Sequence, residues 1–255
     1  MIIFQYDSSF EGLLTSVFDS FNLRKVPDVL IGNQDNLPLF YDEVCVVRTD
    51  KAKAERVWNG LTKKVSSYTI SLITRCWMTE LPNVAMLLFR YLHKIFSCTH
   101  SIESNFTDPD VLAVFQLGKK VTDEYTRALQ FVRFQKTVDN IYFAILEPLY
   151  NILPLTIDHF RNRFSDQQWI IYDVKRKYGI YYDCNTIHEV TFSDTTLLNL
   201  QQILSTPENL AQNELLLQTL WKSYFNTICI KERLNPRKQK KDMPVRYWKY
   251  LTEKY

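Results

Sequence analysis

The hydrophobic residues of this chain change their spacing near residue 137, and this change constrains the fold more than any other feature. Before it, apolar residues recur every three or four positions, as from Phe10 to Phe21, which is the pattern of helices that bury one face. After it, short runs rich in Ile, Tyr, Val and Phe are separated by turn residues, which indicates strands. The sequence therefore predicts an α+β protein, helix-rich in its N-terminal half and with an antiparallel sheet in its second half.

In the first half, residues that favour helix N-termini precede the apolar stripes. Ser8 and Glu11 have the spacing of a capping box in front of the first helix. The sequence DPD at 108–110 places an aspartate before a proline in a first turn, so a long helix is expected from there to about residue 134. Further helix caps are expected at Asp50, Ser66 and Asn83, and strands at residues 2–6 and 43–49.

The second half is expected to start with a strand that ends at Pro148. A short helix follows over LPLTIDHFRNRF, because Pro154 fits its first turn. The run WIIYDVKRKYGIYYD predicts a hairpin with a basic turn, and IHEVTF predicts one more strand. Two helices are expected after that, around residues 195–204 and from Pro207 onward.

Composition indicates one globular domain, 1–255, with 1–136 and 137–255 as its lobes. Hydrophobic residues make up 46% of the chain, and five glycines with nine prolines leave little material for linkers. The N-terminus does not resemble a secretion signal, and no apolar run is long enough to span a membrane. Five widely spaced cysteines, without a C-x-x-C pair, are typical of reduced thiols. We therefore expect a cytoplasmic protein without a membrane segment, and no metal or cofactor bound by this chain itself.

Cations gather near the C-terminus of a chain whose net charge is only +3. Between Lys231 and Lys249 there are eight Lys and Arg residues but only two acids. A short helix over 245–251 is expected to pack its aromatic residues inward and to leave its cations outward. Such a surface can bind a phosphate backbone, although a solvated tail has the same composition. The predicted phosphate contacts are Arg237, Lys238, Lys240, Lys241, Arg246 and Lys249.

A second basic contact is predicted in the sheet region. Its residues are the tip of the hairpin and the end of the preceding short helix, and the neighbouring tyrosines can stack on unpaired bases. Exposed lysines beside core tyrosines are the structural alternative. The cations are Arg161, Arg163, Lys175, Arg176 and Lys177, and the tyrosines are Tyr178, Tyr181 and Tyr182.

A catalytic interpretation is also open. Asp158, followed fifteen residues later by Asp173 and then Lys175, loosely resembles the acid…acid-x-lysine arrangement of metal-dependent nucleases. His159 is the most suggestive histidine because Arg161 follows it closely, although a structural histidine has the same pattern. The chain contains no G-x-x-x-x-G-K-[ST] and no G-x-G-x-x-G motif, which excludes the common phosphate-binding loops.

Several stretches together resemble a known family. YDSSFEGLLTSVFDSF, KAERVWNGL, ILEPLYNILPLTIDHFRNRFSDQQWIIYDVKRKYGIYYD and NPRKQKKDMPVRYW are similar, in this order, to the bacterial "probable DNA metabolism protein" family. That family is a domain of unknown function, found beside a radical-SAM protein associated with DNA modification or repair, or fused to a uracil-DNA glycosylase domain. The resemblance implies a role with DNA and a radical-SAM iron–sulfur protein as partner.

The main functional hypothesis is a DNA-binding accessory protein that acts in DNA repair or modification with a radical-SAM enzyme. One alternative is a DNA-processing enzyme, either glycosylase-like or a metal-dependent nuclease, that uses His159 or the pair Asp158 and Asp173. The other is a protein-interaction module that does not bind nucleic acid, whose basic tail docks on an acidic partner.

Overall fold

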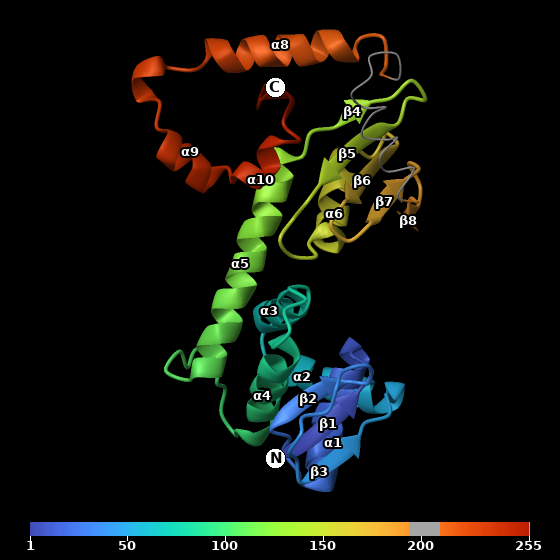
Figure 1. Cartoon of the computed structure of the whole chain (residues 1–255), viewed down its shortest axis with the longest axis vertical. Helices are drawn as coiled ribbons and strands as arrows, with labels where there is room; N and C mark the ends of the chain where they lie inside the picture. The colour runs from blue at the N-terminus through green and yellow to red at the C-terminus, as the bar shows by residue number, and fades with distance from the viewer. Residues whose placement is uncertain (194–209, 255) are drawn as a thin grey trace. The chain divides into compact units, whose positions relative to one another are not determined.

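The structure is a computed structural model that describes residues 1–193 and 210–254. It divides into two compact units, Met1–Thr122 and Asp123–Tyr255. The division falls within helix α5 (Pro109–Phe131), fourteen residues before the predicted lobe boundary. The α+β class predicted from the change of period is confirmed, since helices dominate the first unit and a five-stranded sheet lies in the second (Figure 1).

The first unit is built on a three-stranded parallel sheet of order β2-β1-β3, in which Phe4 aligns with Leu30 on one side and Cys45 on the other. β1 and β3 match the predicted strands, whereas β2 was not predicted. Helices cover the sheet, and the core forms where their apolar stripes meet it. The elements are β1 (Ile2–Tyr6), α1 (Phe10–Leu23), β2 (Val29–Gly32), β3 (Glu43–Val46), α2 (Lys51–Lys64), α3 (Ser67–Trp77) and α4 (Val84–Ser97).

The predicted helix starts are confirmed with one correction. The Asp50 carboxylate accepts the amide of Ala52 at 2.8 Å, and the Asp108 carboxylate accepts the amide of Asp110 at 2.8 Å. The first helix is capped by Ser9, whose Oγ accepts the amide of Gly12, so the capping box predicted for Ser8 is wrong. Ser8 has a φ of 62° and so belongs to the turn before the helix. Ser66 and Asn83 occupy the N-cap positions of α3 and α4, as predicted.

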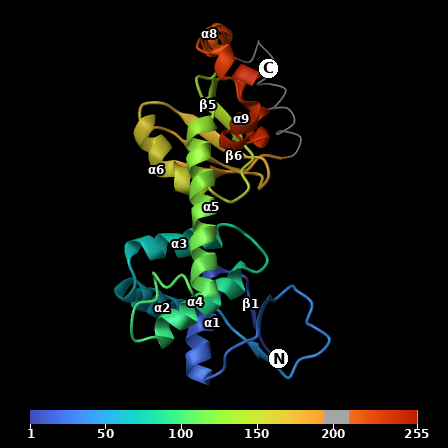
Figure 2. The same cartoon turned by 90° about the vertical axis from the view of Figure 1, so that its left-hand side faces the viewer.

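The second unit contains a sheet of order β4-β5-β6-β7-β8. The hairpin and the strand after it are confirmed as antiparallel pairs, but β5 and β6 pair in parallel, so the sheet is mixed. β5 and β6 can pair in parallel because α6 connects them and returns the chain to the end of the sheet at which β5 begins. α6 packs on one face of the sheet, with Phe160 against Trp169 (Figure 2). The elements are β4 (Gln135–Lys136), β5 (Tyr142–Leu146), α6 (Leu153–Arg163), β6 (Trp169–Asp173), β7 (Tyr178–Tyr182) and β8 (Ile187–Val190).

The described C-terminal part of the second unit is helical, with one longer helix, α8, and several short ones. The helix expected around residues 195–204 lies outside the described residues. The helix expected from Pro207 is described from Glu214, and Leu210 instead forms a β-bridge with Thr137. Among the described residues, no helix is both long and apolar enough to cross a lipid bilayer. The elements are α8 (Glu214–Thr227), the 3-10 turns η2 (Lys231–Arg233) and η3 (Thr252–Lys254), α9 (Pro236–Asp242) and α10 (Val245–Trp248).

Candidate nucleic-acid interface

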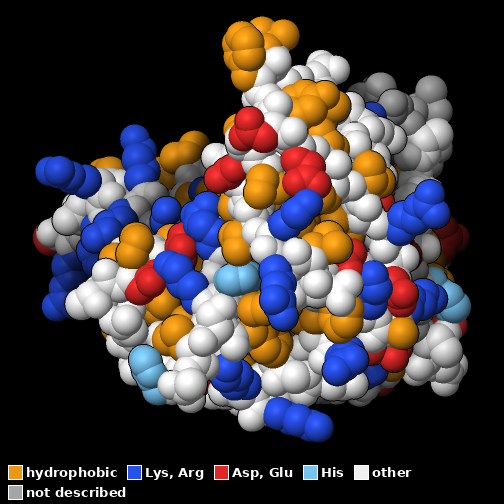
Figure 3. Space-filling model, turned by 90° about the horizontal axis from the view of Figure 1, so that it is seen from below, with side chains coloured by type: hydrophobic (Ala, Val, Ile, Leu, Met, Phe, Trp, Pro, Cys, Tyr) orange, Lys and Arg blue, Asp and Glu red, His pale blue; other side chains and the backbone are white. Residues whose placement is uncertain are grey.

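The predicted basic tail forms a short exposed helix, α9. Asn235 starts it by accepting the amide of Lys238 on its side-chain oxygen at 3.0 Å, and Pro236 occupies the first turn. No residue of α9 is buried. The cations therefore point into solvent, and Figure 3 shows Lys and Arg side chains projecting at the left edge of that view, where α9 lies.

Three cations of α9 share one side of the helix. Arg237, Lys240 and Lys241 are related by three and four residues, which places them within one turn on the same face. None of the three has an acidic partner among the described residues. Lys238 differs, because its Nζ lies 3.0 Å from a carboxylate oxygen of Asp242. We call Arg237, Lys240 and Lys241 the cation stripe.

The segment after α9 is anchored in the second unit as predicted. Tyr247 and Leu251 are buried, and the ring of Tyr247 contacts that of Phe131 at 5.6 Å between centroids. Trp248 is half-buried, and its indole N–H donates to the carbonyl of Met243 at 3.0 Å. The apolar side chains thus hold the basic segment on the body of the unit.

Arg246 and Lys249 do not point freely outward, which corrects the sequence-based expectation. Arg246 donates to the carboxylate of Glu124, which is 1% exposed. Lys249 forms an ion pair with Glu147, which lowers the pKa of that carboxyl and raises the pKa of the Lys249 ammonium. Both cations are neutralised within the unit, so they are poorer phosphate ligands than the cation stripe.

The tip of the hairpin is also tied down. Lys175 donates to the carbonyl of Leu149 at 3.1 Å, and Arg176 donates to the same carbonyl at 3.2 Å and to Asp173 at 2.9 Å. Lys177 is exposed at the turn and has a φ of 58°. The hairpin tip is therefore hydrogen-bonded to the loop before α6 through Lys175 and Arg176.

The predicted stacking tyrosines have structural roles as well. Tyr178 donates to the side-chain oxygen of Asn151 at 2.5 Å, and the buried Tyr182 donates to the carbonyls of Ser165 and Cys184. Tyr181 is half-buried, and its ring stacks on that of His188 at 6.2 Å.

The end of α6 exposes the remaining predicted residues. Arg161 pairs with Asp158 at 2.9 Å, one turn earlier on the helix. Arg163 is exposed and has no acidic partner in the described part of the chain. His159 is exposed, and its ring meets the edge of Phe160. The structure thus places Arg163 on the surface as a cation separate from the hairpin tip.

Asp173 stabilises the hairpin turn. It is fully buried, and its carboxylate accepts the amides of Lys175 at 2.9 Å and Arg176 at 3.2 Å. Burial raises the pKa of the Asp173 carboxyl, against the hydrogen bond from Arg176. Asp158, in contrast, is 81% exposed. Over residues 1–193 and 210–254, no group of three or more His, Cys, Asp or Glu side chains is arranged to bind a metal ion.

The acidic partners of these cations were not anticipated from the sequence. Glu124 and Glu147 lie more than a hundred residues before Arg246 and Lys249. The sequence offered one indication of such a partner. Glu124 lies on the side of α5 that carries buried apolar residues, and a buried carboxylate requires a cation or hydrogen-bond donors.

The fold and the candidate interface define an α+β protein with an exposed basic helix and a hairpin whose tip residues Lys175 and Arg176 are hydrogen-bonded within the second unit. The chain belongs to the DUF4130 family, a domain of unknown function, whose family model matches residues 82–253. No curated protein sequence matches it. A solved structure, the pGpG-specific phosphodiesterase PggH from Vibrio cholerae, aligns with 80% of this chain and 97% of its own at 14% identity. Its TM-score of 0.36 is too low to carry a conclusion on fold or function.

Proposed function

We propose that this chain is a DNA-binding accessory protein in DNA repair or modification, and that it contacts phosphates through the cation stripe of α9. The observation that carries the proposal is the exposure of Arg237, Lys240 and Lys241 on one helix face without acidic partners. The other predicted contacts are weaker candidates, because Lys238, Arg246 and Lys249 are ion-paired.

Electrostatics favours a polyanion as the ligand of this stripe. Each cation that neutralises a phosphate releases condensed counterions, which gives favourable free energy that depends steeply on salt. Three cations within one helical turn can meet adjacent phosphates without any rearrangement of the backbone. The stripe alone does not discriminate between sequences, which suits an accessory protein that holds DNA for another enzyme.

The partner in this proposal is a radical-SAM iron–sulfur protein. The resemblance to the "probable DNA metabolism protein" family supports both this partner and the link to DNA repair or modification. The described thiols do not form a cluster site of their own. In this proposal the partner therefore holds the iron–sulfur cluster and performs the chemistry.

A binding titration tests the phosphate contact. Fluorescence anisotropy is measured with a labelled oligonucleotide, single-stranded and as a duplex, at low salt. The variant Arg237→Gln/Lys240→Gln/Lys241→Gln is expected to weaken binding by at least about tenfold. The matched control Lys51→Gln/Lys119→Gln/Lys120→Gln removes the same charge from exposed residues of the first unit and is expected to bind like the wild type. Equal losses in both variants would show that only net charge matters and would refute the role of α9.

A protein-interaction role is the second candidate, and the surface of α8 favours it. Leu216, Leu217 and Leu220 are 56–59% exposed on this helix, which is unusual for leucines of a packed element. Co-purification with the radical-SAM protein, with and without nuclease treatment, separates the two roles. Binding of the partner after nuclease treatment, together with the absence of any oligonucleotide binding, would favour this second function.

A further inference from the structure

The first unit contains a pocket of about 330 Å³ that combines aromatic walls with a carboxylate. It is formed by the start of α3, by α4, by the loop before α5 and by the first turns of α5. A volume of this size is at the lower end of small-ligand pockets. The residues that determine its chemistry are Tyr68, Tyr91, Glu103, Phe106 and Phe115.

Its walls present aromatic rings to solvent. Tyr68 is 54% exposed and Phe106 is 46% exposed, which leaves much of both side chains uncovered. The rings of Phe106 and Phe115 meet edge to face at 5.0 Å, and Tyr91, which also lines the pocket, is buried. The face of an aromatic ring carries the negative part of the ring quadrupole and attracts cations, so exposed rings are suited to bind them.

Glu103 adds a full negative charge to the pocket. Its Oε1 accepts the amide of Ser66 at 2.9 Å and the hydroxyls of Ser66 and Thr69 at 2.6 and 2.5 Å. Burial opposes ionisation, but these hydrogen bonds outweigh it and lower the pKa of the Glu103 carboxyl. Within the described part of the chain, its Oε2 accepts a single hydrogen bond, from Ser101 at 3.2 Å. Among the described residues, no Lys, Arg or His forms an ion pair with Glu103.

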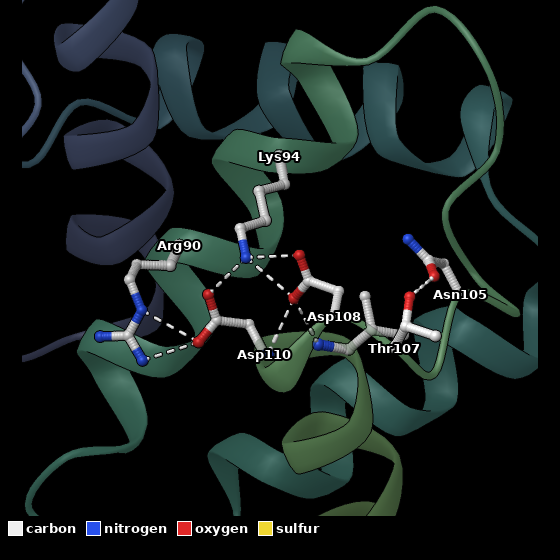
Figure 4. Close-up of polar contacts among 7 residues, drawn as sticks. Arg90, Lys94, Asn105, Thr107, Asp108 and Asp110 are labelled. Carbon is white, nitrogen blue, oxygen red and sulfur yellow. Dashed lines mark hydrogen bonds and ion pairs between the residues drawn. The ribbon is translucent and has the colours of Figure 1, made fainter.

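The loop that carries Glu103 and Phe106 is held in place. At its end, Asp108 accepts from Lys94 at 2.7 and 2.8 Å while capping α5. Asp110 bridges the same Lys94 and Arg90, and Figure 4 shows the four side chains converging between α4 and α5. Two cations and two anions make this cluster neutral, so it fixes the loop without supplying a counter-charge for Glu103.

We infer that this pocket binds an organic cation, an alkylammonium or guanidinium group, between its aromatic rings and Glu103. An ionised carboxylate without a cationic partner among the described residues, together with exposed rings, favours a cation with an apolar stem. A phosphate-bearing ligand is disfavoured, because no Lys, Arg or His lines the pocket. The cation can come from a Lys or Arg side chain of a peptide, or from a free polyamine. This inference is independent of DNA binding by α9.

Two-dimensional NMR titrations of the full chain test it. The probes are spermidine, a capped Gly-Lys-Gly peptide, a capped Gly-Arg-Gly peptide and n-butanol as the uncharged analogue of an alkylammonium. We expect saturable shifts of the Phe106 and Phe115 signals with at least one cation and none with butanol. Tighter binding of a peptide than of spermidine identifies a protein side chain as the ligand, and the reverse identifies a polyamine.

Three variants decide whether the pocket is responsible. Glu103→Gln and Phe106→Ala are each expected to weaken binding by about tenfold. Glu55→Gln removes one exposed carboxylate elsewhere in the first unit and is expected to leave binding unchanged. If Glu103→Gln unfolds α3, Phe106→Ala still tests the inference, because Phe106 is 46% exposed and forms none of the hydrogen bonds that cap α3. Equal binding of butanol, an unchanged affinity in Phe106→Ala, or no saturable binding of any cation would overturn the inference.

Discussion

The guanidinium of Arg246 in α10 forms an ion pair with the carboxylate of Glu124 in α5, which is 1% exposed. The same carboxylate accepts the amide of Leu149 at 2.9 Å, so three segments of the second unit meet at one charge. Arg127 lies 3.8 Å away, one turn along α5. The segment that follows the cation stripe is therefore fixed by the ion pair with the buried Glu124 as well as by Tyr247 and Leu251.

Arg246→Met is expected to destabilise the protein by about 3–5 kcal/mol, because it leaves Glu124 buried without its main partner. Lys249→Met breaks the more exposed pair with Glu147 and is expected to cost at most about 1 kcal/mol. Urea denaturation monitored by circular dichroism measures both. The double variant Glu124→Leu/Arg246→Met removes the unpaired charge and is expected to be less destabilised than Arg246→Met. Equal costs for the Arg246 and Lys249 variants would contradict this account.

Asp173→Asn is expected to destabilise the hairpin by about 2–3 kcal/mol, because the charged hydrogen bond with Arg176 is lost from a fully buried site. Asp158→Asn, at an 81% exposed position, is expected to change stability by no more than about 0.5 kcal/mol. The same preparations are incubated with oligonucleotides and magnesium. A variant Asp173→Asn that keeps the wild-type stability but abolishes a magnesium-dependent cleavage would instead support the nuclease alternative.

Local features of this fold could be predicted from the sequence, because the groups involved lie within a few residues of each other. The caps at Asp50 and Asp108 are examples, since each carboxylate bonds to an amide two residues later. The hairpin from β6 to β7 also depends on a short turn. The parallel pairing of β5 with β6 was missed, because alternating apolar residues do not reveal which neighbour a strand selects or in which direction.

The sequence predicted which cations belong to the candidate interface, but not which of them form ion pairs with acidic residues. The cations of α9 were identified because no apolar residue between them can bury the segment. The neutralisation of Arg246 was not, because Glu124 lies 122 residues earlier in the chain and only the fold brings the two together. The spacing of Arg246 and Lys249 also predicted that they share one helical face. Spacing alone does not determine whether that face contacts solvent or the rest of the protein.

Acid is expected to weaken the contact between α4 and α5. Burial opposes ionisation of Asp110, but ion pairs with Arg90 and Lys94 outweigh it and lower its pKa below the ordinary 3.8. Because the folded-state pKa is depressed, the stabilisation is complete above the unfolded-state pKa and is lost as the pH falls through the folded-state pKa. The stability difference between wild type and Asp110→Asn should therefore shrink between about pH 5 and pH 2, as measured by urea denaturation. Asn105→Ala changes a non-ionisable side chain of the same loop, so its effect should not depend on pH. A constant difference for Asp110→Asn would contradict the ion-pair explanation.

The salt dependence of DNA affinity measures how many cations of the stripe contact phosphates. For duplex DNA, the logarithm of affinity falls with the logarithm of salt concentration with a slope of about −0.9 for each phosphate neutralised. Replacement of Arg237, Lys240 and Lys241 by Gln should therefore make the slope shallower by about 3, and each single replacement by about 1. Lys238→Gln should change it less, because Lys238 is already paired with Asp242. Anisotropy titrations between about 50 and 200 mM salt provide these slopes. If Lys238→Gln changes the slope as much as Lys241→Gln does, the ion pair with Asp242 opens on binding, and the contact surface extends around α9 beyond the stripe.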